Sequence, residues 1–340
     1  MLLLVAGLPG CTSGLSDSAA RTSAGNSASE SDTPNTTPIG DGNAQPDAVE
    51  LALNWLPEAE HGGFFAADIH GLFAARRLQV KIIPGGPGVP VIQNVASGKM
   101  LFGVANADQV LLGRAQEADV VAVFAPLQQS QRCIMVHKKS GVTNFDDLKD
   151  MTLAINPNQT FLGFLKKRQP LRNVRIIQYT GSVAPFLQDD RMGQQAYVFS
   201  EPFTARKQGA EPVNLMVADL GFNPYTSVLV TRAAVIAQQP DLVRRVVEGC
   251  AFGWRKYLDE PASTNEHIHS LNKEMGLDIL EFGTTTLKPL CETGLTSPDR
   301  LGEMTLERWQ TLAEQLIEAE ALKPGIVDPA KAFDASFLPN

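Results

Sequence analysis

The sequence contains no run of apolar residues long enough to span a bilayer, and no block of basic residues. A membrane-spanning helix needs roughly 18 or more apolar residues in succession, so we do not expect the body of the chain to be an integral membrane protein. Acidic and basic residues are mixed along the chain, and the formal net charge is -8. This distribution offers nothing that would neutralise phosphates, which argues against a nucleic-acid partner.

Cysteine is scarce as well. The chain has 4 cysteines and no CxxC pair. Cys133 lies in an apolar, strand-like run, Cys250 in a helical pattern and Cys291 in a loop-like stretch. A chain of 340 residues does not need a disulfide framework. We predict buried free thiols, with a bridge between Cys250 and Cys291 as the alternative.

Motifs of common enzymes are missing too. The chain has no GxSxG, HExxH or Walker A motif, and no GxGxxG followed by an acidic residue. The glycine-rich PGGPG at 84–88 lacks the GKS or GKT ending of a phosphate loop, and Pro87 removes an amide donor, so we expect a tight loop at the mouth of a cleft. His267 and His269 are two positions apart on a predicted helix and point to different faces. No catalytic residue, metal or cofactor is predicted.

What is present begins with the apolar N-terminus MLLLVAGLPGC. Its last four residues resemble a bacterial lipobox, in which the thiol of the cysteine, here Cys11, is diacylated and everything before it is removed. The basic n-region of a secretory signal is missing, which suggests a mis-assigned start codon; a random apolar start with a stray cysteine is the alternative. Residues 12–48 are rich in Ser, Asn, Thr, Gly and Pro, and we expect a flexible linker there.

From Val49 onward, short β-rich runs alternate with helical stretches. Over the whole chain, 44% of the residues are hydrophobic. This pattern predicts an α/β fold with mixed sheets flanked by helices. A second series of strands and helices begins near Thr143, and only helices follow a last strand after Tyr225. Apolar stripes at the 3.6 period predict long helices from Pro240 and from Leu306. We therefore predict two lobes, one of residues 49–137 plus 225–340 and one of residues 138–224, with the helical tail packing on the first.

Five stretches together resemble the NMT1/THI5-like family of type II periplasmic binding proteins. They are residues 54–67, 78–115, 142–155, 198–209 and 304–322, beginning with NWLPEAEHGGFFAA. The resemblance implies a ligand cleft between two lobes and a substrate-binding component of an ABC importer. Together with the lipobox, it leads us to expect an extracytoplasmic, lipid-anchored monomer that serves ABC permease and ATPase subunits.

The family includes binders of pyrimidine thiamine precursors, riboflavin, alkanesulfonates and taurine. The opening segment is similar to the one that supplies an aromatic platform and a histidine in the thiamine-precursor and riboflavin branch, so the resemblance favours a heteroaromatic solute. Sulfonates, taurine and other small nitrogenous metabolites stay open as ligands. A pyrimidine-synthase-like enzyme of the same superfamily is an alternative, although the CCCFC cluster of those enzymes is missing. A periplasmic ligand sensor is another.

Candidate ligand-binding residues follow predicted strands, where ligands bind in open α/β sheets. Trp55 offers a π face for a planar ring, with a core tryptophan as the alternative. His61 opens a helix at which Gly62 and Gly63 would permit close backbone approach, but a capping or surface histidine fits as well. In the family that the chain resembles, an acidic residue faces the cleft at the position of Glu201. A surface glutamate is the alternative.

The remaining candidates stand at predicted helix starts or next to the last strand. Asn106 and Asp108 suit either ligand binding or an N-cap. Asn158 and Thr160 precede a helix whose N-terminal amides would favour an anionic group. Tyr225, just before the last predicted strand, completes the set.

Overall fold

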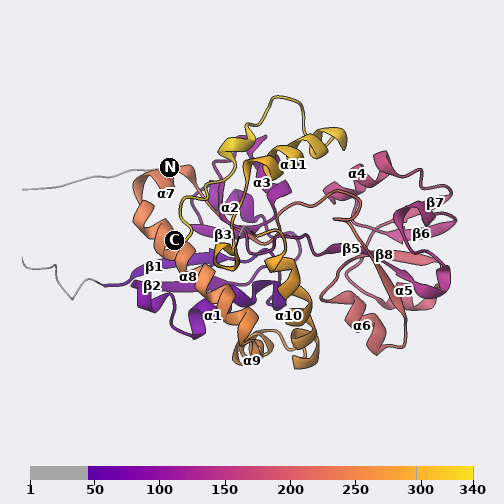
Figure 1. The fold of residues 1–340 in the computed structure, drawn as a ribbon, viewed down its shortest axis with the longest axis horizontal. Helices are drawn as coiled ribbons and strands as arrows, with labels where there is room; N and C mark the ends of the chain where they lie inside the picture. The colour runs from indigo at the N-terminus through magenta and orange to yellow at the C-terminus, as the bar shows by residue number, and fades with distance from the viewer. Residues whose placement is uncertain (1–44, 296, 340) are drawn as a thin grey trace, which may run out of the picture. The chain divides into compact units, whose positions relative to one another are not determined.

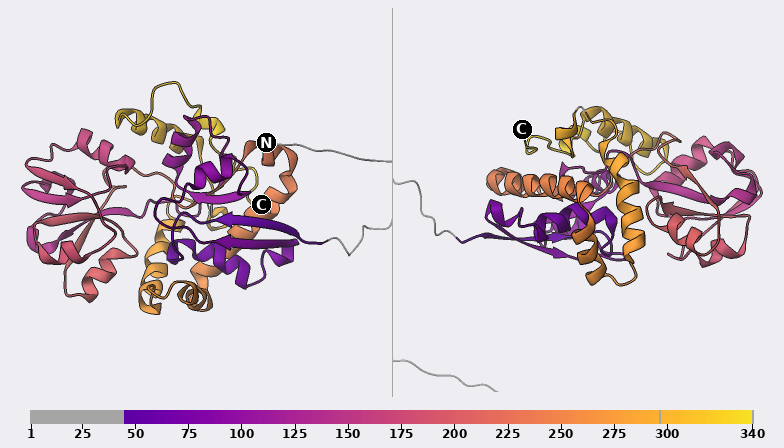
Figure 2. Two further views of the ribbon diagram at one scale, coloured as in Figure 1. Left: turned by 180° about the vertical axis from the view of Figure 1, so that it is seen from behind. Right: turned by 60° about the horizontal axis from the view of Figure 1, so that its bottom comes forward.

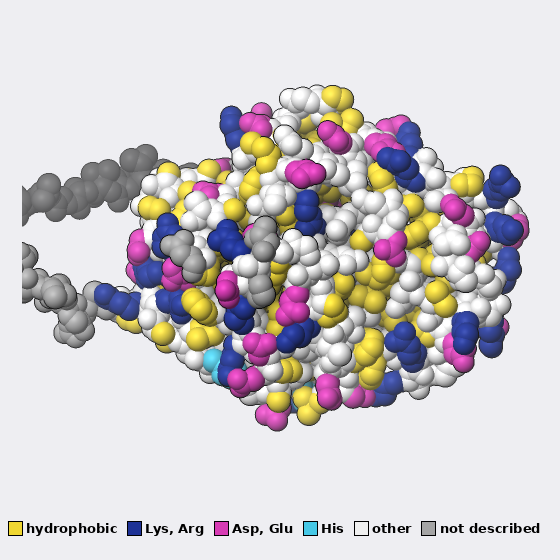
Figure 3. Space-filling view, in the orientation of Figure 1, with side chains coloured by type: hydrophobic (Ala, Val, Ile, Leu, Met, Phe, Trp, Pro, Cys, Tyr) yellow, Lys and Arg dark blue, Asp and Glu magenta, His cyan; other side chains and the backbone are white. Residues whose placement is uncertain are grey.

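The computed structural model describes residues 45–295 and 297–339. The Cys11 lipidation site and all but the last few residues of the predicted linker lie outside these ranges. The first strand begins at Asp47, so the folded part starts within the linker that we predicted to run to residue 48. Over the described residues, no helix is long and apolar enough to cross a membrane. Figure 3 shows Lys and Arg interspersed with Asp and Glu on one face.

The first of two five-stranded sheets has the strand order β2-β1-β3-β10-β4. Its strands are β1 (Asp47–Ala52), β2 (Leu78–Ile83), β3 (Phe102–Ala105), β4 (Val121–Phe124) and β10 (Val228–Thr231). The pairs of β1 with β2 and with β3 are parallel, whereas β10 runs antiparallel to β3 and β4. The strand between β3 and β4 therefore comes from a late part of the chain.

The second sheet repeats this pattern with the order β7-β6-β8-β5-β9. Its strands are β5 (Arg132–His137), β6 (Met151–Ala154), β7 (Val174–Ile177), β8 (Met192–Tyr197) and β9 (Pro212–Met216). Here β5 is the antiparallel strand, between β8 and β9. Figures 1 and 2 show this sheet, in magenta to pink, at the end of the unit away from β1 and β2. Two mixed sheets flanked by helices confirm the predicted two-lobed α/β fold.

The boundary between the lobes differs from the prediction. β5 was expected to end the first lobe at residue 137, but it pairs with β8 and β9 in the second sheet. The chain therefore crosses between β4 and β5, before Arg132, and returns between β9 and β10. The sequence did not predict β9, because PVNLM starts with proline. In the structure this strand is only partly buried.

The helices lie between the strands and in the tail. Within the first lobe they are α1 (Gly62–Ile69), α2 (Val91–Ala96) and α3 (Ala107–Arg114), and within the second α4 (Thr160–Arg168), α5 (Ala184–Gln188) and α6 (Glu201–Lys207). The tail contains α7 (Ala233–Gln238), α8 (Pro240–Asp259), α9 (Ala262–Leu271), α10 (Leu277–Glu292) and α11 (Leu306–Glu318). Short 3-10 helices are η1 (Ala59–His61), η2 (Ala74–Arg76), η3 (Lys138–Ser140), η4 (Phe145–Asp147), η5 (Pro298–Arg300) and η6 (Pro329–Lys331).

The two long tail helices begin where the stripes predicted. In α8 the whole predicted stripe from Leu242 to Leu258 is buried. In α11 Trp309 and Leu316 are buried, but Leu306 is 41% exposed and does not belong to the buried face. Cys133, Cys250 and Cys291 are buried free thiols, so the alternative bridge between the last two is not formed.

The tail does not pack on the first lobe alone. α8 lies against α1, as predicted, but α11 contacts both α3 and α4. One hydrophobic cluster joins Val110 of α3, Phe164 of α4 and Trp309 of α11. On the other flank, α10 reaches α6, where the rings of Phe203 and Phe282 lie 5.1 Å apart. The tail helices thus bridge the two lobes on both sides of the chain crossings.

Candidate functional site

The segment after β1 places Trp55 at the surface and then turns inward. Trp55 is 38% exposed, so it is not the core tryptophan of the alternative reading. The amide of Gly85 donates to the carbonyl oxygen of Trp55 over 2.9 Å. A Cβ at Gly85 would lie 2.3 Å from the carbonyl oxygen of Leu53, so only glycine allows this contact. The PGGPG loop is therefore packed against the backbone that carries Trp55.

Three residues farther on, charged side chains enter the interior. Glu58, Glu60 and His61 are 4%, 1% and 0% exposed. The Oε2 atom of Glu60 accepts from Nε2 of Gln131 at 2.9 Å and from Oγ of Ser227 at 3.2 Å. Its Oε1 atom has no hydrogen-bond partner among the described residues and lies 3.5 Å from Nε2 of His61.

His61 is a neutral acceptor in this environment. Burial lowers the pKa of His61 to about 3. Its Nε2 lies 2.9 Å from Oδ1 of Asn54, which can only accept, so Nε2 carries the proton. Nδ1 is left as an acceptor with no hydrogen-bond partner among the described residues. The ring is thus an internal polar group rather than a surface histidine.

Gly62 and Gly63 have a different role from the one predicted. A Cβ at Gly62 would lie 2.0 Å from the ring of Tyr257, and one at Gly63 would lie 2.1 Å from the ring of Trp254. Both aromatic residues are on α8. The glycines therefore permit the close approach of α8 to α1, which fixes the direction in which His61 enters the interior.

Glu201 reaches the same region from the second lobe. It is the first residue of α6; its Oε1 accepts from the hydroxyl of Tyr179 at 2.9 Å and its Oε2 from the backbone amide of Tyr197 at 2.8 Å. Burial raises the pKa of Glu201, against the effect of these hydrogen bonds. Its charge is close enough to raise the pKa of both Glu58 and Glu60. Carboxylates from both lobes therefore converge.

Burial is the main cause of the altered acidity of the first-lobe carboxyl groups. It raises the pKa of Glu60 to about 7, although hydrogen bonds from Ser227 and Gln131 and the charge of Arg132 act in the opposite direction. Burial, together with the charge of Glu60, also raises the pKa of Glu58 well above its ordinary value. Near neutral pH this cluster holds protons that exposed carboxylates would release.

Asp108 connects the lobes at a second point. It lies in the first turn of α3 and is 2% exposed, and its Oδ2 accepts from Nη1 of Arg132 at 2.8 Å and from Oγ1 of Thr160 at 2.5 Å. Burial alone would raise the pKa of Asp108, but the charge of Arg132 and the hydrogen bonds hold it below its ordinary value. Asn106, the N-cap of α3, accepts from the amide of Ser227 at 3.2 Å.

Two predicted residues stand apart from these groups. Asn158 is exposed in the loop before α4, and its amide donates to Oδ1 of Asn156. Tyr225 is 2% exposed in the core; its hydroxyl accepts from the amide of Thr305 at 3.1 Å, and Arg308 lies 3.7 Å from its ring centre. Thr305 and Arg308 thus occupy both the hydroxyl and the ring of Tyr225. The structure therefore does not bring Tyr225 into the polar cluster, the buried polar side chains around Glu58, Glu60, His61 and Glu201.

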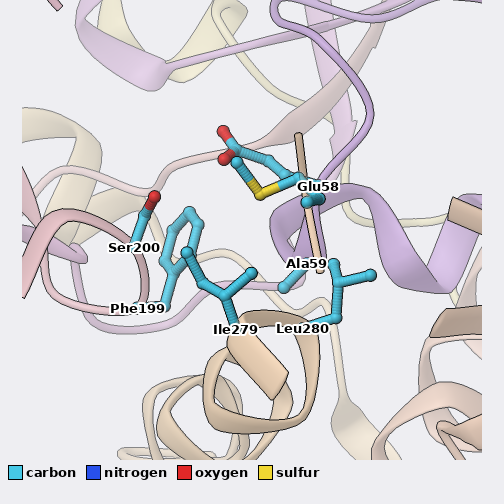
Figure 4. Close-up of a pocket in the computed structure, with 7 residues that line it drawn as sticks. Glu58, Ala59, Phe199, Ser200, Ile279 and Leu280 are labelled. Atoms are coloured by element: carbon cyan, nitrogen blue, oxygen red, sulfur yellow. The ribbon is translucent and has the colours of Figure 1, made fainter. Parts of the chain in front are cut away.

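Figure 4 shows a crevice next to Glu58, where residues of the first lobe face residues of the second. Phe199 and Ser200 come from the second lobe, and Ile279 and Leu280 come from α10. Figure 4 shows the carboxylate of Glu58 pointing away from the helix that carries Ile279 and Leu280. The crevice has no room for an organic ligand in this arrangement, because side chains of both lobes fill it.

Sequence reasoning missed several members of the polar cluster. They are Glu58, Glu60, Gln131, Arg132, Tyr179 and Tyr197. The available signal was the dense EAEH run at 58–61, a few residues after the end of β1 at Ala52, since strand ends are where sites form. For Arg132 the signal was a charge at the start of an apolar strand.

The chain is similar in sequence to known solute-binding proteins. A family described as "NMT1/THI5 like" matches residues 58–264. The riboflavin-binding protein RibY of Chloroflexus aurantiacus is 26% identical in an alignment of 314 residues that covers 88% of this chain and 88% of that one. A formylaminopyrimidine-binding protein of Halalkalibacterium halodurans is 30% identical over 109 residues, which is 32% of this chain and 33% of that one.

Among solved structures, the periplasmic aliphatic sulphonate binding protein SsuA of Escherichia coli has the same fold. It superposes with a TM-score of 0.66 at 13% identity, over 85% of this chain and 92% of its own. At this identity the likeness shows the fold alone. Since the family match covers more than half of the chain, the protein belongs to the NMT1/THI5-like family.

Proposed function

We propose that this protein is the substrate-binding component of an ABC importer, and that it captures a small heteroaromatic solute by closing its two lobes. The observation that carries the proposal is that buried Glu58 of the first lobe lines one crevice with Phe199 and Ser200 of the second, directly before Glu201 at the start of α6. A group bound there contacts both lobes at once, which is how hinged binding proteins couple binding to closure. The names of two relatives, a riboflavin-binding and a formylaminopyrimidine-binding protein, point to the same ligand class.

The chemistry of the cluster favours a ring with alternating donors and acceptors. Oε1 of Glu60 and Nδ1 of His61 are buried polar atoms without hydrogen-bond partners among the described residues, and both can accept hydrogen bonds from ring N–H groups. A protonated Glu58 or Glu60 donates to a ring nitrogen or carbonyl. Trp55 offers an exposed indole face for stacking. A sulfonate group has only acceptor oxygens, so it offers no donor to Oε1 of Glu60 or Nδ1 of His61, and its negative charge is repelled by that of Glu201.

A thermal-shift panel tests the ligand class. We expect riboflavin or a formylaminopyrimidine to stabilise the protein, and taurine and ethanesulfonate to leave it unchanged. A solute that binds only the folded state at 100 times its Kd adds about 2.7 kcal/mol of stability. Stabilisation by the sulfonates alone would overturn the proposed ligand class. The same panel, repeated with pyridoxal phosphate and an absorbance scan for a lysine aldimine, tests the competing enzyme.

The N-terminus completes the proposal. We place the protein outside the cytoplasm as a monomer tethered by a lipid on Cys11, where it delivers solute to a permease driven by ATPase subunits. Replacing Cys11 by Ser should release the protein from the membrane fraction while ligand binding stays unchanged, because in this proposal the thiol is the acylation site and takes no part in binding. Fractionation followed by immunoblotting measures this. Membrane retention of the Cys11→Ser variant would exclude the lipid anchor at this residue.

A further inference from the structure

The carboxylate of Asp108 is fully engaged by the protein. Its Oδ1 accepts from the amide of Gln109 at 3.1 Å and from Nη2 of Arg132 at 3.3 Å. Its Oδ2 accepts from Nη1 of Arg132 at 2.8 Å and from Oγ1 of Thr160 at 2.5 Å. With two donors on each oxygen, Asp108 has no acceptor position left for a solute. This suits a structural contact better than the ligand contact that the sequence suggested.

The two partners of Asp108 lie at different distances from the chain crossings. Arg132 is the first residue of β5, and its carbonyl oxygen accepts from the amide of Val217 at the start of the returning segment. Both crossings therefore meet at Arg132, where a rotation of the lobes moves atoms least. Thr160 begins α4 after β6, and β6 is separated from β5 by β8. Two strand spacings place β6 about 10 Å from β5, so the same rotation moves Thr160 farther.

The environment makes the hydrogen bond from Thr160 strong. Asp108 and Arg132 are 2% and 4% exposed, so their charges are shielded from water. A hydrogen bond to a buried, ionised acceptor is stronger than one between neutral groups. By contrast, the ion pair of Lys207 with Asp278, which also joins the lobes, has side chains 60% and 52% exposed and contributes little.

We propose that Asp108 is an interlobe latch: Arg132 holds its carboxylate in place, and the hydroxyl of Thr160 binds it only when the lobes are closed. Asp108 and Thr160 are then positioning residues, which set the closing equilibrium and do not touch the solute. Because closing and binding are linked, loss of the latch weakens the observed affinity by the factor by which it lowers the fraction of closed molecules. The expected loss of affinity rests on the proposed function, whereas the expected loss of closure does not.

The test uses Thr160, since altering Asp108 would leave the buried charge of Arg132 unpaired. Thr160→Val keeps the shape and removes the hydroxyl, whereas Thr160→Ser keeps the hydroxyl. Small-angle scattering on the full chain without added solute should show an expanded Thr160→Val protein, with Thr160→Ser and the control Asp278→Asn matching wild type. Titration calorimetry with the best solute of the panel should show affinity about ten-fold weaker for Thr160→Val and nearly unchanged for Thr160→Ser.

The two measurements separate failure of the latch from failure of the proposed function. Identical scattering of Thr160→Val and wild type would overturn the latch, whatever the solute is. Expansion of Thr160→Ser to the same extent as Thr160→Val would also overturn it, because packing of the side chain and not the hydroxyl would then hold the lobes. Expansion of Thr160→Val alone supports the latch even if no solute in the panel binds.

Discussion

Replacing Trp55 by Ala or Glu201 by Gln should weaken solute binding by about ten-fold to a hundred-fold in each case. Trp55 belongs to the first lobe and is 38% exposed, so its removal takes away a stacking surface and little core packing. A ring stacked on an indole face gains roughly 1 to 3 kcal/mol, judging from bases stacked on aromatic side chains. The indole is therefore expected to supply much of the affinity from the first lobe.

Glu201 acts from the other lobe. The side chain of glutamine keeps an oxygen that accepts from the Tyr179 hydroxyl or from the Tyr197 amide, so the start of α6 should survive the change. What is lost is the negative charge, and a hydrogen bond to a charged group is worth about 1.5 to 3 kcal/mol. Closure on the solute should diminish in both variants, because each removes the contact of one lobe.

Titration calorimetry and small-angle scattering with solute measure both effects. Two surface substitutions serve as matched controls: Phe252→Ala removes a ring that is 43% exposed on α8, and Glu314→Gln removes an exposed charge on α11. Neither should change affinity. If Trp55→Ala and Glu201→Gln bind and close like wild type, the solute binds elsewhere.

Replacing Glu60 by Gln should change how stability depends on pH. A carboxyl group whose pKa is higher in the folded than in the unfolded state holds its proton on folding, so stability falls as pH rises between the two values. For Glu60 the window runs from its ordinary value of 4.5 to about 7. Over this window the wild type should lose about 3 kcal/mol relative to Glu60→Gln, at 1.36 kcal/mol for each pH unit.

His61 contributes with the opposite sign. Burial lowers its pKa from 6.5 to about 3, so the folded state excludes a proton that the unfolded state binds. The stability associated with neutral His61 is therefore present above pH 6.5 and is lost as pH falls toward 3. Between pH 4.5 and 6.5 the contributions of Glu60 and His61 to the stability of the wild type have opposite signs. Their sum should therefore vary little with pH in this range.

Urea unfolding between pH 4.5 and 8 separates the two contributions. Measured against the wild type, Glu60→Gln should gain stability between pH 4.5 and about 7, because the titrations of Glu58, His61 and Glu201 are common to both proteins and only that of Glu60 is removed. His61→Gln, which retains a donor toward Asn54, should lose stability up to pH 7. Parallel curves for the wild type and Glu60→Gln would show that Glu60 titrates normally and is not buried as described.

The elements that the sequence predicted best are those whose pattern alone decides their structure. The stripe from Leu242 to Leu258 repeats at the helical period, and all of it is buried in α8. β9 was missed because an edge strand needs only one buried face, and Pro212 at its start is typical of a turn as well. The lobe boundary was misplaced because β5 is as apolar as a strand of either sheet.

The polar cluster was harder to predict, because burial of a charge depends on parts of the chain far apart in sequence. Glu60 meets Gln131, 71 positions away, and Ser227, 167 positions away. Nothing local distinguishes Glu60 from a surface glutamate. Gly62 and Gly63 were correctly seen as sites of close approach, but the approaching group is α8, more than 180 positions later.

The chain crossings described above make the second sheet an insertion. Residues 132–216 form that sheet as one continuous stretch, and the two crossing segments are joined by an antiparallel bridge between Leu127 and Thr226. When the two ends of a stretch lie side by side, the stretch can be exchanged without changing the structure of the domain into which it is inserted. This is why inserted domains are tolerated. One half of the proposed binding surface is therefore expected to tolerate exchange between relatives as a unit, while β10 and the tail helices keep the frame that receives it.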